Sequence, residues 1–265
     1  MSVLFADQTW PQLERAVQEN RLILLPVGQV EEHGRHLPVS TDAAIASAVG
    51  RSLAESLVEH GVPTLVMPTL WTGYSTKEMA RWPGTMRVRP QVLTDLLFDV
   101  CMSLVEMGFR KIILLNCHGH HTGILRVVVR RISDECDVYM AMFSPATLSA
   151  AAYNEVRQSE RGGSIHGGEW ETALMLHLGE PVDMSQVTDE DAMRYHSDFV
   201  AGDNFTGSQK VFWSTWGIQK SRTGIYGDPT QATAETGQKI MEAILKEGAA
   251  FAREYATVSD RASET

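Results

Sequence analysis

Residues 22–42 read LILLPVGQVEEHGRHLPVSTD, a stretch that joins a strand pattern to a cluster of acid and imidazole side chains. Its first six residues form an unbroken apolar run, which is typical of a buried strand in a parallel sheet. Glu31 and His33 follow just past that run and project to the same side of an extended chain. Ligands bind at the carboxyl ends of strands in open α/β sheets, so this stretch predicts a fold class and places a site within it.

Two further segments have the same construction. Residues 111–115 (KIILL) form a second apolar strand pattern, and residues 116–121 (NCHGHH) follow at its end. Residues 165–172 (IHGGEWET) place two glycines at the start of a helical pattern, where anionic groups are favoured. A single histidine beside an apolar strand is more often an ordinary hydrogen-bonded residue than a ligand. Three such segments together predict a metal site, because their His, Asp and Glu side chains suit zinc, manganese or iron.

The order of these motifs resembles the signature of the creatininase (creatinine amidohydrolase) family. The resemblance covers most of the chain and rests on Pro26-Val27-Gly28, the run from Glu31 to Asp42, Trp82-Pro83-Gly84-Thr85, Asn116-Cys117-His118-Gly119 and the run from His166 to Thr172. It implies a three-layer α/β sandwich, with a mostly parallel central sheet flanked by helices, formed by residues 1–265 as one domain. It also implies two divalent metal ions per chain, zinc or manganese or both, with iron as a further candidate. The expected reaction is hydrolysis of a non-peptide C–N bond in a small amide such as a cyclic amide, a lactam-like compound or a formamide.

Carried over residue by residue, the family pattern implies a role for each matching side chain. Glu31 and His33 would each bind one of the two ions, and Asp42 would bridge them. His118 matches the histidine ligand of the second motif. Glu171 matches the carboxylate that closes the third motif, and we interpret it as a ligand or a close neighbour of one.

The third motif also supplies a candidate proton carrier. His166 matches the histidine that handles the substrate and its proton, so we expect it to protonate the departing nitrogen after a metal-bridged hydroxide attacks the amide carbon. Glu169 lies close by at the start of the helical pattern and could orient His166 or pass on its proton. An equally good interpretation of Glu169 is a solvated carboxylate that interacts with the start of the helix.

The chain departs from creatininase at positions that concern the substrate. His120 stands where creatininase has a glutamate ligand, and we expect His120 and Trp82 to contact the substrate. Creatininase packs tryptophans against its small ring, whereas Pro145 and Gly162 stand near the corresponding positions here. A ring without stacking partners loses both apolar burial and orientation, so creatinine is predicted to be a poor substrate.

Composition excludes some classes of partner, and the family resemblance implies that the partner is a small-molecule amide. The net charge of -10 argues against nucleic acid, because binding to a polyanion relies on Lys and Arg. No segment approaches the roughly 18 apolar residues of a membrane span, and the first residues lack the pattern of a leader peptide. Three cysteines, an odd number, favour reduced thiols, so we expect a cytoplasmic protein. The resemblance adds the expectation of a homo-oligomer such as a hexamer.

Two other functions are compatible with the same residues. The chain could be a non-catalytic metal- or ligand-binding protein on this scaffold, because His120 replaces a ligand glutamate. A two-metal site could also hydrolyse phosphate esters. Against that stands the absence of a glycine-rich phosphate loop, and only Arg35 and Arg81 lie near the motifs.

The remaining pattern predicts alternating helices and strands, which implies a parallel sheet. Helices are predicted over residues 43–60, 91–107, 122–134 and 231–255, and short strands over residues 62–67 and 138–143. Residues 183–226 are predicted to be irregular, with a hairpin near residues 210–216. The aromatic residues of this region are interpreted as a pocket lining, an oligomer contact or ordinary packing beneath a loop, and they are Phe205, Phe212, Trp213 and Trp216.

Overall fold

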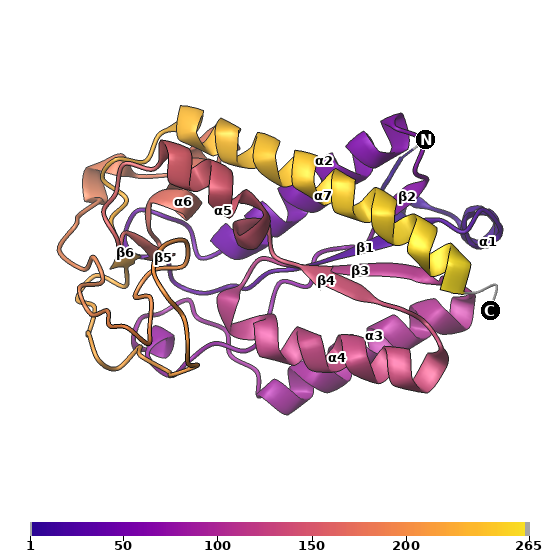
Figure 1. Cartoon of the computed structure of the whole chain (residues 1–265), viewed down its shortest axis with the longest axis horizontal. Helices are drawn as coiled ribbons and strands as arrows, with labels where there is room; N and C mark the ends of the chain where they lie inside the picture. Colours follow the sequence, from indigo (N-terminus) through magenta and orange to yellow (C-terminus); the bar gives the residue numbers. More distant parts are fainter. Residues whose placement is uncertain (1, 263–265) are drawn as a thin grey trace.

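The computed structural model describes residues 2–262 and has a four-stranded parallel sheet at its centre (Figure 1). The central pair, β1 (Leu22–Val27) and β3 (Lys111–Asn116), runs in parallel along all six residues of each strand. The shorter strands β2 (Thr64–Val66) and β4 (Ala141–Phe143) flank this pair, so that the order is β2–β1–β3–β4. Every residue of β1 and β3 is buried, which accounts for the continuous apolar runs at residues 22–27 and 112–115.

Helices cover both faces of this sheet and give the molecule three layers (Figure 1). Because side chains alternate along a strand, Leu22 and Leu24 pack into one layer whereas Ile23 and Leu25 pack into the other. The first layer consists of α2 (Thr41–Glu59), α5 (Pro145–Val156), α6 (Glu169–His177) and α7 (Ala234–Ala262). The second consists of α3 (Pro90–Met107) and α4 (Thr122–Cys136), joined by α1 (Trp10–Gln18). The expected α/β sandwich is confirmed.

Most elements lie within a few residues of their predicted positions. β1 has its predicted bounds, and β3 is one residue longer than predicted. Neither α5 nor the two-stranded antiparallel pair of β5 (Ser164–His166) and β6 (Tyr226–Gly227) was predicted. Among the described residues, no helix has the length and apolar character needed to cross a membrane.

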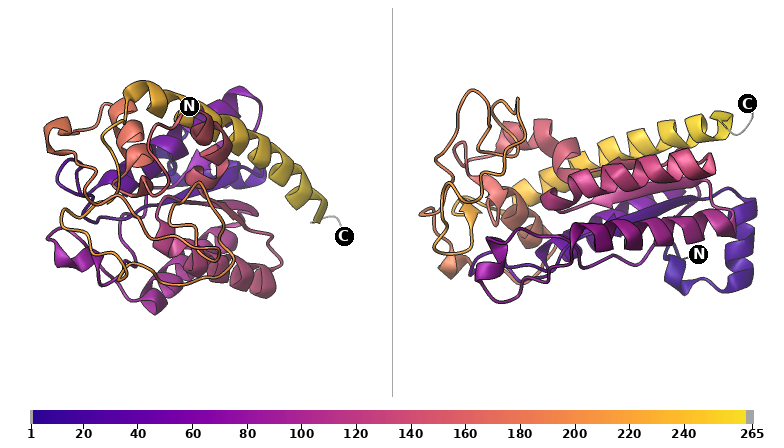
Figure 2. Two further views of the ribbon diagram at one scale, coloured as in Figure 1. Left: turned by 60° about the vertical axis from the view of Figure 1, so that its left-hand side comes forward. Right: turned by 90° about the horizontal axis from the view of Figure 1, so that it is seen from below.

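A long irregular segment covers the end of the molecule beside β5 and β6 (Figures 1 and 2). After a single helical turn at Met184–Gln186, residues 187–225 form neither helix nor strand. The predicted hairpin near residues 210–216 is therefore wrong. Its aromatic residues suggested strands, but no part of the segment pairs as a strand with another.

Two buried carboxylates hold this irregular segment in place. Asp203 receives two hydrogen bonds of 3.0 Å from the guanidinium of Arg157 and a third of 2.7 Å from the Gly162 amide. Asp191 accepts hydrogen bonds of 2.8 Å from the Ser221 hydroxyl and from the Thr223 amide. The segment thus owes its shape to side-chain contacts between residues distant in sequence, and not to a repeating backbone pattern.

Candidate active site

The predicted ligands converge where β1 and β3 end. Glu31 and His33 lie in the loop after β1, and His118 lies just past β3. Asp42 occupies the first turn of α2, which packs closely on the chain after β1: a Cβ at Gly28 would lie 2.6 Å from the Ala43 Cα. This close approach requires glycine and brings Asp42 beside the other ligands.

Asp42 lies between two histidines, as a bridging ligand would. Its Oδ1 is 3.3 Å from His33 Nε2, and its Oδ2 is 2.8 Å from His118 Nδ1. Glu171, in the first turn of α6, approaches the same His33 nitrogen at 3.9 Å. His33, Asp42 and Glu171 thus form one compact group of potential ligands, with ligand atoms within 4.8 Å of one another.

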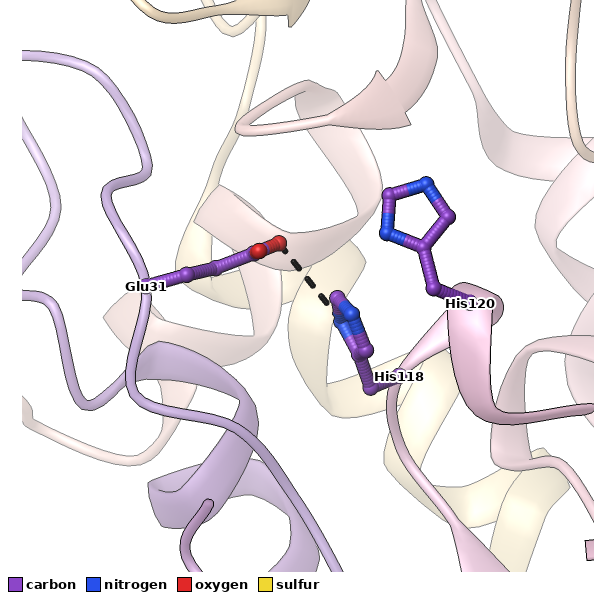
Figure 3. Close-up of side chains that lie close together, drawn as sticks. All are labelled: Glu31, His118 and His120. Carbon is purple, nitrogen blue, oxygen red and sulfur yellow. Dashed lines mark ion pairs between the residues drawn. The ribbon is translucent and has the colours of Figure 1, made fainter. Parts of the chain in front are cut away.

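A second compact group contains Glu31, His118 and His120 (Figure 3). Glu31 Oε1 lies 3.5 Å from His118 Nδ1, and the His120 ring stands beside them. Ser75 donates a hydrogen bond to the other oxygen of Glu31, which leaves Oε1 directed into the site. Sequence analysis did not single out Ser75, because it lies in an irregular loop that carries no ligand motif.

The donor atoms fit divalent metal ions. Several buried polar atoms of the site have no hydrogen-bond partner, and they are Glu31 Oε1, His118 Nε2 and both ring nitrogens of His120. Each buried polar atom without a partner destabilises the folded protein by about 1–3 kcal/mol. A group of such atoms in one place therefore requires an explanation. Imidazole and carboxylate donors suit zinc and manganese. The group of His33, Asp42 and Glu171 and the group of Glu31, His118 and His120 share no residue, and each offers three ligands.

The pKa values in the site follow from burial and from the mixture of charges. Burial alone would lower the pKa of His118, but the carboxylates of Glu31 and Asp42 outweigh it and raise the pKa to about 9. Burial, assisted by His118 and His166, lowers the pKa of His120 to about 2. His120 is therefore neutral across the working pH range, which is the form of imidazole that binds a metal.

His166 presents one ring nitrogen to the site and uses the other to hold its place. Its Nε2 lies 2.7 Å from the Glu32 carbonyl oxygen, which can only accept, so Nε2 carries the hydrogen. Its Nδ1 is then the free nitrogen and lies 3.4 Å from Glu31 Oε1. The ring centroid is 4.2 Å from that of His33, and His166 also forms a ligand group with Glu31 and His33.

Glu32 is a buried acid that the sequence motif did not distinguish from its neighbours. Its Oε1 lies 3.5 Å from His166 Nε2, and its Oε2 accepts a 3.0 Å hydrogen bond from the Gly34 amide. Gly224 makes room for this carboxylate, since a Cβ there would collide with it. Glu32 thus supports His166 from the side opposite the ligands.

Glu169 points away from the ligand groups. It is fully buried, and its oxygens accept hydrogen bonds from the Ser159 amide at 2.7 Å, the Gln158 amide at 3.0 Å and the Tyr153 hydroxyl at 3.2 Å. The interpretation of Glu169 as a solvated carboxylate is therefore wrong. Its contacts anchor the start of α6 to the chain after α5, and it does not line the cavity described next.

A cavity of about 270 Å³ opens beside the two ligand groups. Phe205, Phe212 and Trp216 of the irregular segment form an aromatic wall. The Trp216 ring centroid lies 4.9 Å from that of His120 and 4.8 Å from that of Tyr226. Among the described residues that line this cavity none is Arg or Lys, so its positive charge would come from bound metal and from protonated histidine.

This aromatic wall removes the reason for predicting that creatinine is a poor substrate. Gly162 has a φ of +94°, and a Cβ there would collide with the Met193 carbonyl oxygen, so no tryptophan fits at that position. An indole reaches the cavity nevertheless, from Trp216 more than fifty residues further along the chain. Trp82, by contrast, is half-buried beneath the Arg81 guanidinium, 5.0 Å from its ring centroid, and does not line the cavity.

Comparisons with known proteins agree with this geometry. The model of the creatininase family, described as creatinine amidohydrolase, matches residues 6–252. The mycofactocin precursor peptide peptidase of Mycobacterium tuberculosis is 30% identical over 228 residues, which cover 84% of this chain and 81% of the relative. Two solved creatininase structures, one described as the Mn form and one as a mutant of Zn–Zn type, are each 25% identical with a TM-score of 0.79. Each alignment covers 96% of this chain and 98% of the other.

Proposed function

The chain belongs to the creatininase family and is a metal-dependent amidohydrolase, and we propose that it hydrolyses the non-peptide C–N bond of a small uncharged amide. The observation that carries this proposal is the pair of ligand groups joined through Asp42 beside an aromatic cavity that has no Arg or Lys. A cyclic amide, a lactam-like compound and a formamide all fit this description. A phosphate ester fits less well, because no Arg or Lys among the described residues lines the cavity to bind its charged oxygens.

In this proposal each ligand group holds one divalent ion. Glu31, His118 and His120 would hold the first ion, and His33 with Glu171 the second, with Asp42 between the two. Bound ions of this kind supply an acidified water and polarise the amide carbonyl. In this proposal His120 is a metal ligand and not the substrate contact that the sequence led us to expect.

The remaining steps belong to side chains of the chain itself. His166 carries a proton at Nδ1 to the departing nitrogen, while its Nε2 stays hydrogen-bonded to the Glu32 carbonyl oxygen. Trp216 covers the cavity, orients the substrate and excludes water from the reacting bond. Glu169 and Trp82 are left out of this set, because neither lines the cavity.

The direct test combines metal analysis with an amide panel. Purified protein should hold close to two divalent ions per chain and should hydrolyse at least one amide of the panel, which includes creatinine. Chelation should abolish that activity, and added zinc or manganese should restore it. Turnover of phosphate esters in place of amides, or full activity with only trace metal, would contradict the proposal.

A further inference from the structure

Part of the irregular segment carries exposed aromatic side chains, and one of them, Phe212, lines the cavity. Phe199, Phe212 and Trp213, which we call the mouth patch, are 58%, 97% and 51% exposed. The Phe199 carbonyl oxygen accepts hydrogen bonds of 2.9 Å from the Lys210 amide and 3.3 Å from the Val211 amide, so the two parts of the patch lie side by side. Large apolar side chains gathered on a surface in this way mark a binding site more often than chance exposure.

Phe212 connects this patch to the catalytic cavity. It lines the cavity together with Trp216 and is also the most exposed large apolar side chain of the described residues. The ring therefore stands at the rim, with the cavity on one side and solvent on the other. A substrate seated in the cavity and extending outward would cross this ring before reaching water.

The rim is fixed in position at two points. Asp203, held by Arg157, anchors the segment between Phe199 and Phe212. The hydrogen bond from Ser221 to Asp191 ties the chain that follows the patch to the chain that precedes it. A recognition surface on an anchored loop binds with a smaller loss of conformational entropy than one on a free loop.

The charges around the rim favour an uncharged, apolar group. No Arg or Lys lines the cavity, and the acidic residues that do line it belong to the ligand groups. The cation beside the patch is Lys210, whose Nζ lies 5.9 Å from the Phe199 ring centroid. An acidic extension on the substrate could pair with Lys210, so an acidic amide is a direct comparison for the apolar one.

We propose that the mouth patch is a second binding site, which receives an aromatic or large aliphatic group extending from the amide that is cleaved in the cavity. The preferred substrate is then an extended amide with an apolar arm and not a compact ring alone. This inference rests on the proposed amide hydrolysis and names the class of substrate for it.

The test uses the metal-loaded enzyme and matched amides that differ only in the extension. On the acyl side, acetamide is compared with hydrocinnamamide and with succinamic acid, which carries an acid in place of the ring. On the amine side, formamide is compared with N-benzylformamide. We expect kcat/KM to be at least about tenfold higher for the apolar member of one series, since burial of a large apolar group changes specificity by that order.

Three variants locate the effect. Phe212→Ala should reduce the ratio of apolar to short amide by about tenfold, and Phe212→Leu should retain part of it. Trp10→Ala is the matched control, because Trp10 is 76% exposed on α1 at the opposite end of the molecule and should leave the ratio unchanged (Figure 1).

Binding measured by calorimetry on the same loaded protein separates the two proposals. Tighter binding of the apolar amides without any turnover would support the mouth patch and contradict amide hydrolysis. Turnover with equal kcat/KM across each series, a preference for succinamic acid, or an unchanged ratio in Phe212→Ala would overturn the mouth patch.

Discussion

Asp42 joins the two halves of the site through its two carboxylate oxygens, which approach different histidines at 3.3 Å and 2.8 Å. Burial would raise the pKa of Asp42, but His33 and His118 outweigh it and hold the pKa well below its ordinary value. The carboxylate is therefore ionised whenever the protein is folded. A single residue thus contributes a negative charge to the site and links its two ligand groups.

The first prediction concerns this residue. Asp42→Ala should remove more bound metal than any other single ligand change, because Asp42 lies between the two ligand groups and would give one oxygen to each ion. Metal per chain, measured by inductively coupled plasma mass spectrometry, should fall toward zero, whereas Asp99→Ala on the exposed face of α3 should retain close to two ions. If Asp42→Ala and Glu31→Ala each retained one ion per chain, Asp42 would not be a bridging ligand.

The second prediction separates His166 from the ligands. His166→Ala should keep both ions but lose about 10² to 10⁴-fold in kcat, because the leaving nitrogen no longer receives its proton. The loss should shrink for an amide whose amine leaves easily without protonation. A missing ion in the variant, or an equal loss for good and poor leaving groups, would assign His166 to coordination with Glu31 and His33.

At the scale of elements, the irregular segment depends on the ion pair between Asp203 and Arg157. Burial would raise the pKa of Asp203, but hydrogen bonds from Arg157 outweigh it and lower the pKa below its ordinary value. A carboxyl group whose pKa is lower in the folded state stabilises that state fully above the unfolded pKa, which is about 4. This contribution is lost as the pH falls below that value.

The third prediction follows from the lowered pKa of Asp203. Asp203→Asn should lower the free energy of unfolding near pH 7 by about 3 kcal/mol, because it leaves a buried guanidinium without its partner. The free energy of unfolding of the variant should also fall less steeply below about pH 4 than that of the wild-type protein. Asp198→Asn, an exposed position of the same segment, is the control. Denaturant unfolding at several pH values measures both effects, and identical pH profiles for wild type and Asp203→Asn would contradict the prediction.

The sequence predicts the ligand-bearing elements well and the substrate-bearing segment poorly, for a physical reason. A buried parallel strand must be apolar throughout, so β1 and β3 are visible in the sequence, and ligands at their ends follow from the fold. The shape of residues 187–225 comes from contacts such as Asp203 with Arg157, which no local pattern reveals. The positions of Trp216 and Glu169 depend on such contacts and could not be predicted.

At the scale of the whole molecule, assembly is the fourth prediction. The family resemblance implies a homo-oligomer such as a hexamer, and the described residues expose large apolar side chains outside the mouth patch, among them Trp71 and Met86. Multi-angle light scattering at micromolar concentration should therefore give a mass several times the 29.3 kDa of one chain. A mass equal to one chain would contradict it.

The proposed metal ligands come from strand ends and helix starts, whereas the aromatic wall and the mouth patch come from a loop that contributes none of the proposed ligands. The two parts of the molecule are therefore free to evolve at different rates. Substitutions at Phe199, Phe212 and Trp213 can redirect the enzyme to another amide while Asp203 still holds the loop and Trp216 still covers the cavity. For a laboratory evolution experiment, these three codons are the part of the gene to randomise, because a new specificity can arise there without the loss of catalysis that usually accompanies change in an active site.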